Sequence, residues 1–490
     1  MMAQRRKNIL FLMTDQQRLD YCGFSGSGKL ATPNIDRLAE SVGLVNCQTV
    51  NPICTPARAA LLTGKYTHQI GMVAMSGDLS LQHPTYPRAL QEAGYWTAGI
   101  GKFHFLQGWH WSAPRGKGHD LVAIRGEVKR YGFDHVWETA GKQLALKNTC
   151  DYCKHLDSQG LLEAFRDHVE GRGPNVDHPT GEREKKDFGD PWPFAEEDYV
   201  DVLTGEKIRE AIDLRPRDRP FFVFGSFCGP HKPFDPPRRH LEMVEYEEID
   251  DFIPGERAIA PAEKKRLYRK RRAYKGMILC IDEQIGLICD KLEDEGLLDE
   301  TVILFASDHG EMLGDHFRVQ KAMPWKESAT VPAAIRHPDF LAKGADGPPV
   351  NASPVEITDL TATILDIAGV DPQQALSMDW PAGNNVVPCR SLMPIVDGRA
   401  ASIREFTFSE CDNQWQMIQT ARWKHIRWLD YPGPDEPKES FFDLQADPDE
   451  IDDWIADPAY RQAIDWCRRR RDFVLDRTPP AQLRWAPLID

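Results

Sequence analysis

The chain has 490 residues, more than one ordinary hydrophobic core accommodates, so we expect one large domain followed by a smaller one. Its 60 lysine and arginine residues stand against 75 aspartate and glutamate residues, and the net charge of −15 disfavours nucleic acid and anionic membranes as partners. No stretch approaches the ~18 apolar residues of a membrane span, and the basic start at residues 5–7 precedes an apolar run too short for a secretion signal, so we expect a cytoplasmic protein.

The first element in chain order is a short strand at residues 8–13, which is apolar almost throughout. An uninterrupted apolar run predicts a strand covered on both faces, as in a parallel sheet between helices. Asp15 and Gln16 follow this strand closely. Because working side chains gather at the carboxyl ends of such strands, both are candidate site residues.

Residues 54–58, Cys-Thr-Pro-Ala-Arg, form the most unusual motif of the chain. Pro56 fixes a turn and residues 59–63 are typical of a helix, so we expect Cys54 at a helix N-terminus, an end that attracts anions. Arg58 adds a fork of donors that matches a tetrahedral oxyanion. The motif predicts that Cys54 is a nucleophile facing a sulfate or phosphate ester. The alternative interpretation is that Cys54 is a buried cysteine at a loop-to-helix junction without a chemical role.

Two further strands, at residues 95–100 and 220–227, also end in polar side chains. Lys102 and His104 follow the first, and His231 follows the second. Between these strands, residues 106–217 are polar, aromatic and irregular, which predicts an insertion above the sheet that sets substrate selectivity. Its tryptophans would either stack on a sugar or aryl ring or form local core; they are Trp109, Trp111, Trp137 and Trp192.

The later elements complete the predicted architecture. A helix is expected at residues 274–292, and a strand at 301–306 repeats the plan of the first strand, ending in Asp308 and His309. An amphipathic helix is expected at 356–368, antiparallel strands at 406–428 and an Arg-rich helix at 460–475. We therefore predict an α/β domain at residues 1–400, with a large, mostly parallel sheet sandwiched by helices, and a small α+β C-terminal domain at 401–490 that contains an antiparallel sheet.

The eleven cysteines are expected to remain thiols, since no secretion signal is recognised. Cys150 and Cys153 form a CxxC motif with His155 close by. A structural zinc site needs a second pair of ligands, which this motif lacks. We therefore interpret the two cysteines as structural or incidental and not as zinc ligands, with a local redox or metal role as the alternative.

The unbroken run from Cys54 to Tyr66, CTPARAALLTGKY, resembles the signature of the formylglycine-dependent (type I) sulfatases of the alkaline phosphatase-like superfamily. In that family a formylglycine-generating enzyme oxidises the cysteine to formylglycine, whose aldehyde hydrates to a gem-diol. One hydroxyl attacks sulfur, and the second allows sulfate to be expelled. The resemblance therefore implies that Cys54 is the precursor of the nucleophile.

The resemblance also implies a divalent metal ion. The ligands it assigns are Asp15, Gln16, the converted Cys54, Asp308 and His309. Hard oxygen ligands with one nitrogen suit Ca²⁺, Mg²⁺ or Mn²⁺ better than structural zinc. Many sulfatases carry a second aspartate where this chain has Gln16, so one negative charge is missing here. Ca²⁺ is the family default, with Mn²⁺ or Mg²⁺ as alternatives.

The resemblance further implies a set of catalytic side chains. They are Cys54, Arg58, Lys102, His104, His231, Asp308 and Lys321, the last followed by Ser328 as in the family. Arg58, Lys102 and Lys321 would neutralise the sulfate oxygens. Asp308 would accept the proton of the nucleophile, His231 with Lys321 would protonate the leaving alcohol, and His104 would take the proton whose loss expels sulfate. His68, near the motif, is expected to support the site or to pack.

Hydrolysis of a small-molecule sulfate ester is the function that these patterns predict. The alternative is a phosphonate monoester or phosphodiester hydrolase of the same superfamily, in which the Lys-x-His pair is typically replaced by hydroxyl residues; Lys102 and His104 favour sulfate here. A non-catalytic protein with an unmodified Cys54 is a third possibility. The long insertion and the C-terminal tail leave room for contacts in a homo-oligomer.

Overall fold

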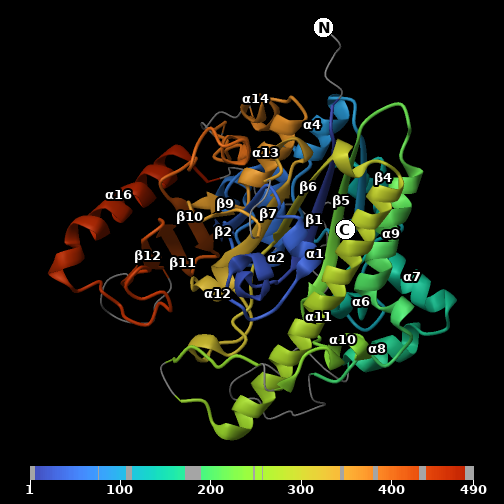
Figure 1. The fold of residues 1–490 in the computed structure, drawn as a ribbon, viewed down its shortest axis with the longest axis horizontal. Helices are drawn as coiled ribbons and strands as arrows, with labels where there is room; N and C mark the ends of the chain where they lie inside the picture. The colour runs from blue at the N-terminus through green and yellow to red at the C-terminus, as the bar shows by residue number, and fades with distance from the viewer. Residues whose placement is uncertain are drawn as a thin grey trace.

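The computed structural model describes residues 6–75, 77–105, 113–170, 189–246, 249–255, 258–342, 347–378, 385–429 and 438–480. A nine-stranded sheet crosses the centre of the molecule (Figure 1), in the order β4-β3-β5-β1-β6-β7-β2-β8, with β9 paired to β2. Its strands are β1 (Asn8–Asp15), β2 (Val42–Gln48), β3 (Trp96–Gly101), β4 (His135–Glu138), β5 (Phe221–Pro230), β6 (Thr301–Ser307), β7 (Thr330–Arg336), β8 (Val350–Asn351) and β9 (Val355–Glu356).

Most neighbouring strands of this sheet are parallel. The run from β4 to β6 is parallel throughout, whereas β7 runs antiparallel to both β6 and β2. The register pairs Thr14 of β1 with Ser307 of β6, and Met13 of β1 and Gly101 of β3 with Ser226 of β5. The residues that follow β1, β3, β5 and β6 therefore meet at one edge, which confirms the predicted mostly parallel sheet.

Helices cover both faces of the sheet, as the apolar strands require. Ile9 and Phe11 of β1 face a core that includes Leu61 and Leu90, while Leu10 and Leu12 face the opposite core. The first face carries α2 (Cys54–Thr63), α3 (Thr67–Ile70), α4 (Tyr86–Glu92), α5 (Arg125–Lys129), α13 (Asp359–Ile367), α14 (Pro372–Leu376) and α15 (Met393–Val396). The second carries α1 (Pro33–Arg37), α9 (Val200–Leu214) and α11 (Pro261–Asp294), with α10 (Arg238–Glu242) against α11.

Helix α11 is longer than the helix predicted at residues 274–292. Its first turns carry the sequence EKKRLYRKRR, in which charged residues obscure the apolar spacing on which the prediction rested. These turns extend beyond the sheet at the lower end of Figure 1.

The stretch predicted as an insertion contains both sheet elements and a separate core. Within residues 106–217, β4 pairs with β3, α5 packs on the first face of the sheet and α9 packs on β5, so these three elements belong to the main layers. The remaining helices, α6 (Lys142–Ala145), α7 (Asp151–Ser158) and α8 (Leu162–Glu170), surround a third apolar core. Trp192 is buried in it against Phe194 and Tyr199, which supports a packing role, and Trp137 packs beside it. Trp109 and Trp111 lie outside the described residues.

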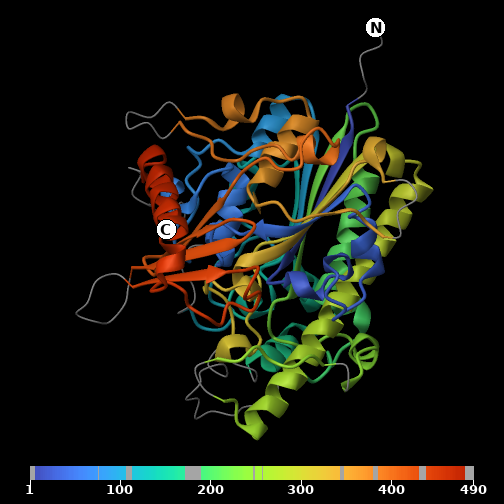
Figure 2. The same cartoon turned by 60° about the vertical axis from the view of Figure 1, so that its left-hand side comes forward.

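A second, antiparallel sheet of four strands follows near the C-terminus, as predicted. Its strands are β10 (Thr407–Cys411), β11 (Trp415–Gln419), β12 (Trp423–Trp428) and β13 (Glu439–Asp443), and α16 (Arg461–Arg477) packs on it. Figure 2 shows this sheet and α16 on the side of the main sheet opposite α9 and α11. Phe408 and Ile418 share a core with Ala60 and Tyr66, so the small sheet rests on the segment that begins with Cys54. The short helix α12 (Lys326–Ala329) contacts the same region through Ala329.

A buried charge cluster joins the two sheets. Arg404, just before β10, pairs with Glu356 at 3.0 Å and with Asp359. Glu356 also accepts hydrogen bonds from the Tyr66 hydroxyl at 3.0 Å and from the Phe408 backbone N–H at 2.9 Å. Burial raises the pKa of Glu356 to about 7 although Arg404 opposes the shift. The division at residue 400 stays a prediction, since the two parts share this cluster and an apolar core.

Among the described residues, no helix is both long and apolar enough to cross a membrane.

Replacing Arg404 by methionine tests the cluster. The substitution leaves two buried carboxylates without their cation, so we expect the free energy of unfolding to fall by about 3–5 kcal/mol, less at acidic pH where Glu356 is neutral. Urea denaturation at two pH values measures both effects. Arg399→Met removes an exposed arginine paired with Asp397 and should leave the transition unchanged; equal losses in the two variants would contradict the assignment.

Candidate active site

Two aspartates at neighbouring strand ends form the base of the site. Asp15 ends β1, Asp308 directly follows β6, and both are fully buried. Asp308 Oδ1 accepts the backbone N–H groups of Gln16 and His309, each at 2.9 Å. This carboxylate therefore ties the two strand ends together.

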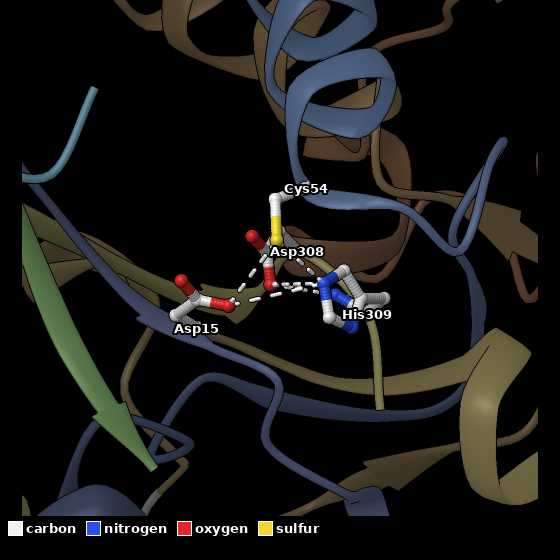
Figure 3. Close-up of side chains that lie close together, drawn as sticks. All are labelled: Asp15, Cys54, Asp308 and His309. Carbon is white, nitrogen blue, oxygen red and sulfur yellow. Dashed lines mark hydrogen bonds and ion pairs between the residues drawn. The ribbon is translucent and has the colours of Figure 1, made fainter. Parts of the chain in front are cut away.

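Four side chains converge at this edge, as Figure 3 shows. Asp15, Cys54, Asp308 and His309 offer ligand atoms that all lie within 4.8 Å of one another. Cys54 Sγ lies 3.2 Å from His309 Nε2 and 3.7 Å from Asp15 Oδ1. His309 Nδ1 donates to the Gly310 carbonyl at 2.9 Å, so Nε2 is the ring nitrogen that faces the cluster. Two carboxylates and one imidazole fit a divalent cation with a preference for oxygen ligands.

Cys54 reaches this cluster because it begins α2. The helix has an extended residue, Ile53, before it and Pro56 in its first turn, and all of its residues are buried. Figure 3 shows the thiol pointing from the end of the helix toward the aspartates. The predicted helix N-terminus is therefore present.

Cations surround the two aspartates. Lys102, directly after β3, forms an ion pair with Asp15, and Arg58 Nε donates to Asp308 Oδ2 at 2.8 Å. Arg58 Nη1 donates to Ser226 Oγ at 2.8 Å and to the Lys102 carbonyl at 2.6 Å. Arg58 Nη2 is buried without a hydrogen-bond acceptor, and His104 Nδ1 is buried without a hydrogen-bond partner. A buried donor without an acceptor costs about 1–3 kcal/mol, so an anion that places an oxygen beside Arg58 Nη2 would recover that cost.

Lys321 completes the ring above Cys54. Its Nζ lies 2.7 Å from Cys54 Sγ and 3.2 Å from Gln16 Oε1. A cavity of about 170 Å³ opens beside these atoms. The predicted residues that line it are Cys54, Lys102, His104, His231 and Lys321, while Arg58, Asp15, Gln16, Asp308 and His309 lie outside its lining.

The charges of the site shift several pKa values. Burial raises the pKa of Asp15, but Lys102, His231 and Arg58 outweigh it and hold that pKa well below its usual range. Burial and Asp15 likewise raise the pKa of Cys54, yet Lys321 and Lys102 bring it below that of an ordinary thiol.

The pKa values of the two histidines of the cavity are lowered as well, which favours their neutral forms. Burial lowers the pKa of His104 well below its usual range, and Lys102 and Arg58 add to the effect. Burial also lowers the pKa of His231, helped by Lys321. Both rings are therefore neutral near pH 7 before an anion binds.

Some residues that hold the site escaped the sequence prediction. Asp201, in the first turn of α9, accepts the backbone N–H groups of Cys228 and Gly229 at 2.7 and 3.0 Å and so fixes the end of β5 directly before His231. Ser226 holds Arg58, and Glu311 accepts from the side chain of Gln16. Of these three residues, only Glu311 lies close in sequence to a predicted site residue, three positions after Asp308.

Two other candidates lie elsewhere. His68 pairs with Glu410 at 2.8 Å and with the Thr478 carbonyl at 2.7 Å, so it packs against the C-terminal region. Ser328, the serine predicted downstream of Lys321, is buried and close to Met323 N at 3.4 Å.

The CxxC motif is a buried pair of thiols. Cys150 and Cys153 lie 3.5 Å apart, Sγ to Sγ, and His155 turns to Asp198 at 2.8 Å. Within the described ranges, neither cysteine belongs to a group of three or more potential metal ligands, which supports the structural interpretation. All eleven cysteines are free thiols.

Comparisons with known proteins agree with this geometry. A family model described as Sulfatase matches residues 7–370. An arylsulfatase from Clostridium perfringens is 31% identical over 491 residues, which cover 95% of this chain and 93% of the relative. A solved phosphonate monoester hydrolase from Silicibacter pomeroyi has a TM-score of 0.76 at 21% identity and covers 99% of this chain and 100% of its own. Another structure, in complex with its substrate D-glucosamine-2-N,6-O-disulfate, has a TM-score of 0.69 at 20% identity, with 98% and 100% covered. At these identities the two structures establish the fold alone.

The reactivity of the unconverted thiol tests the electrostatics of the cavity. Because the pKa of Cys54 is lowered, its thiolate persists to lower pH, and iodoacetamide should alkylate it below the pH range of ordinary thiols in chelator-treated protein. Lys321→Met should move the midpoint of the rate upward, whereas Lys326→Met, which removes a lysine paired with Asp449, should not. Peptide mass spectrometry at a series of pH values gives the rates. Cys228 lines the same cavity with a raised pKa, so alkylation of Cys228 before Cys54 would refute this account.

Proposed function

Because the chain belongs to the sulfatase family, we propose that it hydrolyses a small-molecule sulfate ester through a formylglycine formed from Cys54. One observation carries this proposal. Lys102 and His104, the pair that favours sulfate over phosphonate, share one buried cavity with Cys54. Arg58 Nη2, which has no hydrogen-bond acceptor although Asp15 Oδ2 lies 3.9 Å away, would contribute the anion recognition that the reaction needs.

The metal assignment follows from the donor set. Asp15, Gln16, Asp308, His309 and residue 54 would hold a divalent cation, with Ca²⁺ as the first choice and Mn²⁺ or Mg²⁺ as the second. When bound, such an ion supplies positive charge next to the sulfate oxygens and lowers the pKa of a hydroxyl at residue 54.

The hydrated formylglycine supplies two hydroxyls on one carbon, one for attack on sulfur and one for the later release of sulfate. Asp308 is assigned as the acceptor of the first proton. The hydrogen bonds from Arg58 and two backbone N–H groups keep its carboxylate in place.

His104 is assigned as the base of the second half-reaction. Its lowered pKa keeps the ring neutral near pH 7, and its Nδ1 has no hydrogen-bond partner. A neutral imidazole with a free nitrogen can take the proton whose loss restores the aldehyde and expels sulfate.

His231 and Lys321 are assigned to the leaving alcohol. His231 Nδ1 donates to the Lys232 carbonyl at 2.9 Å, so Nε2 is the atom available for proton transfer. Burial holds its pKa well below the usual range, and the positive charge of Lys321 adds to the shift although Asp15 opposes it. A bound sulfate offsets that repulsion and so favours the protonated ring when the alcohol leaves.

Maturation by a formylglycine-generating enzyme, a cytoplasmic location and assembly as a homo-oligomer are parts of the same proposal. Nucleic acid is not a proposed partner, since the net charge is −15.

A phosphonate monoester or phosphodiester hydrolase is the second candidate, because it would share the charge and geometry of the site. Paired aryl sulfate and aryl phosphonate substrates discriminate the two, and we expect the larger kcat/KM for the sulfate. Peptide masses first identify converted protein, since conversion replaces sulfur by oxygen and removes two hydrogens. The Cys54→Ala variant should be inactive on both. A larger kcat/KM for the phosphonate would overturn the choice of sulfate, and full activity in Cys54→Ala would overturn the nucleophile.

Truncation of His231 tests its role as proton donor. We expect His231→Ala to lower kcat/KM for an alkyl sulfate by about 10²–10⁴-fold, but far less for 4-nitrophenyl sulfate, whose anion leaves without a proton. His240→Ala provides a control, since that buried histidine pairs with Glu283 instead. An equal loss on both esters would show that His231 serves binding or folding rather than proton transfer.

A further inference from the structure

We propose that Glu311 is a positioning residue that fixes the side-chain amide of Gln16 with its oxygen toward the metal site. The inference rests on the proposed function, because it requires a divalent cation to bind beside Gln16. The motifs that identified the metal ligands in the sequence assign no role to Glu311.

Gln16 is constrained through all four of its hydrogen-bonding groups. Its backbone N–H donates to Asp308 at 2.9 Å, and its carbonyl accepts from the Tyr274 hydroxyl at 2.5 Å. Its side-chain Nε2 donates to Glu311 Oε2, and its Oε1 accepts from Lys321 at 3.2 Å. The backbone φ of 72° lies in the left-handed region, which a side chain other than glycine adopts at a cost. This residue is therefore held in one orientation by its surroundings.

Glu311 cannot turn away from the amide. It is 3% exposed, and its backbone N–H donates to the Glu327 carbonyl at 2.8 Å. Its second oxygen, Oε1, accepts from the backbone N–H groups of Leu313, at 3.2 Å, and of Gln320. With Oε1 committed to the backbone, Oε2 is the oxygen that faces Gln16.

The carboxylate decides which end of the amide faces the site. A reversed amide would place its oxygen against the Glu311 carboxylate and its NH₂ group against Lys321 Nζ, so both contacts would become repulsive. The observed orientation is the one that presents an oxygen to a cation.

The same contacts extend to Cys54. Lys321 Nζ bridges Gln16 Oε1 and Cys54 Sγ, and the backbone of Gln320 is tied to Glu311. Hydrogen bonds in such a chain polarise one another, so the charge of Glu311 strengthens the acceptor that Gln16 offers. Glu311 thereby positions a metal ligand and the lysine above the nucleophile together.

Exchanging the two side-chain types tests the proposal. In Glu311→Gln the backbone N–H groups of Leu313 and Gln320 retain the residue's single oxygen, so its NH₂ group faces Gln16 and forces that amide to reverse. We expect Ca²⁺ and Mn²⁺, titrated calorimetrically into the chelator-treated full chain, to bind about 10–100-fold more weakly. The double variant Gln16→Glu/Glu311→Gln restores the hydrogen bond with donor and acceptor exchanged, so it should recover the affinity of the parent protein.

Glu410→Gln is the matched control. It neutralises another buried glutamate, one that contacts Thr67 and His68, and should leave metal affinity unchanged. Equal affinity in Glu311→Gln and the parent, or no recovery in the double variant, would overturn the proposal. If Glu311→Gln fails to fold, a folded double variant with parental affinity supports the proposal, and an unfolded one overturns it. A parent protein that binds neither ion would refute the metal assignment itself, whereas the choice between sulfate and phosphonate does not affect these titrations.

Discussion

Two fully buried carboxylates at the ends of adjacent parallel strands are the constraint on which this structure depends. Ionised groups are costly to bury unless cations and hydrogen bonds compensate them. Here Lys102 pairs with Asp15, and Arg58 pairs with Asp308. The cations come from β3 and α2, so the register of the sheet and the position of α2 must both be correct before the aspartates are compensated. At this edge of the sheet, the buried charges are therefore compensated only when the strands and α2 have reached their native positions.

Much of the site could be predicted because each part has a local signature. An apolar strand followed by a polar residue located Asp15, Lys102, His231 and Asp308 without knowledge of their neighbours. The parallel sheet then required these strand ends to meet, and the register confirms that they do. Cys54 was located by its turn and helix, which the structure places as predicted.

The supporting residues could not be predicted in the same way. Asp201 lies in the first turn of α9 and acts on the backbone at the distant end of β5, so no spacing in the sequence marks it. Glu311 acts through Gln16, a contact that depends on how two loops meet after the sheet has formed. The length of α11 was also missed, because its first turns carry charge instead of an apolar stripe. Local patterns therefore identified the groups that meet at the strand ends, and tertiary contacts determine what holds them.

The central place of β1 in the sheet means that the site can be completed only late in the synthesis of the chain. β1 lies between β5 and β6, and β6 belongs to a part of the chain made long after Cys54. At about 5–20 residues per second, the roughly 250 residues from Cys54 to Asp308 require on the order of 10–50 s of synthesis. Throughout that interval the thiol has neither His309 nor Lys321 beside it, whereas in the finished molecule it is 1% exposed. The thiol of Cys54 is thus open to solvent during synthesis and becomes buried only when the last strands of the sheet have been made.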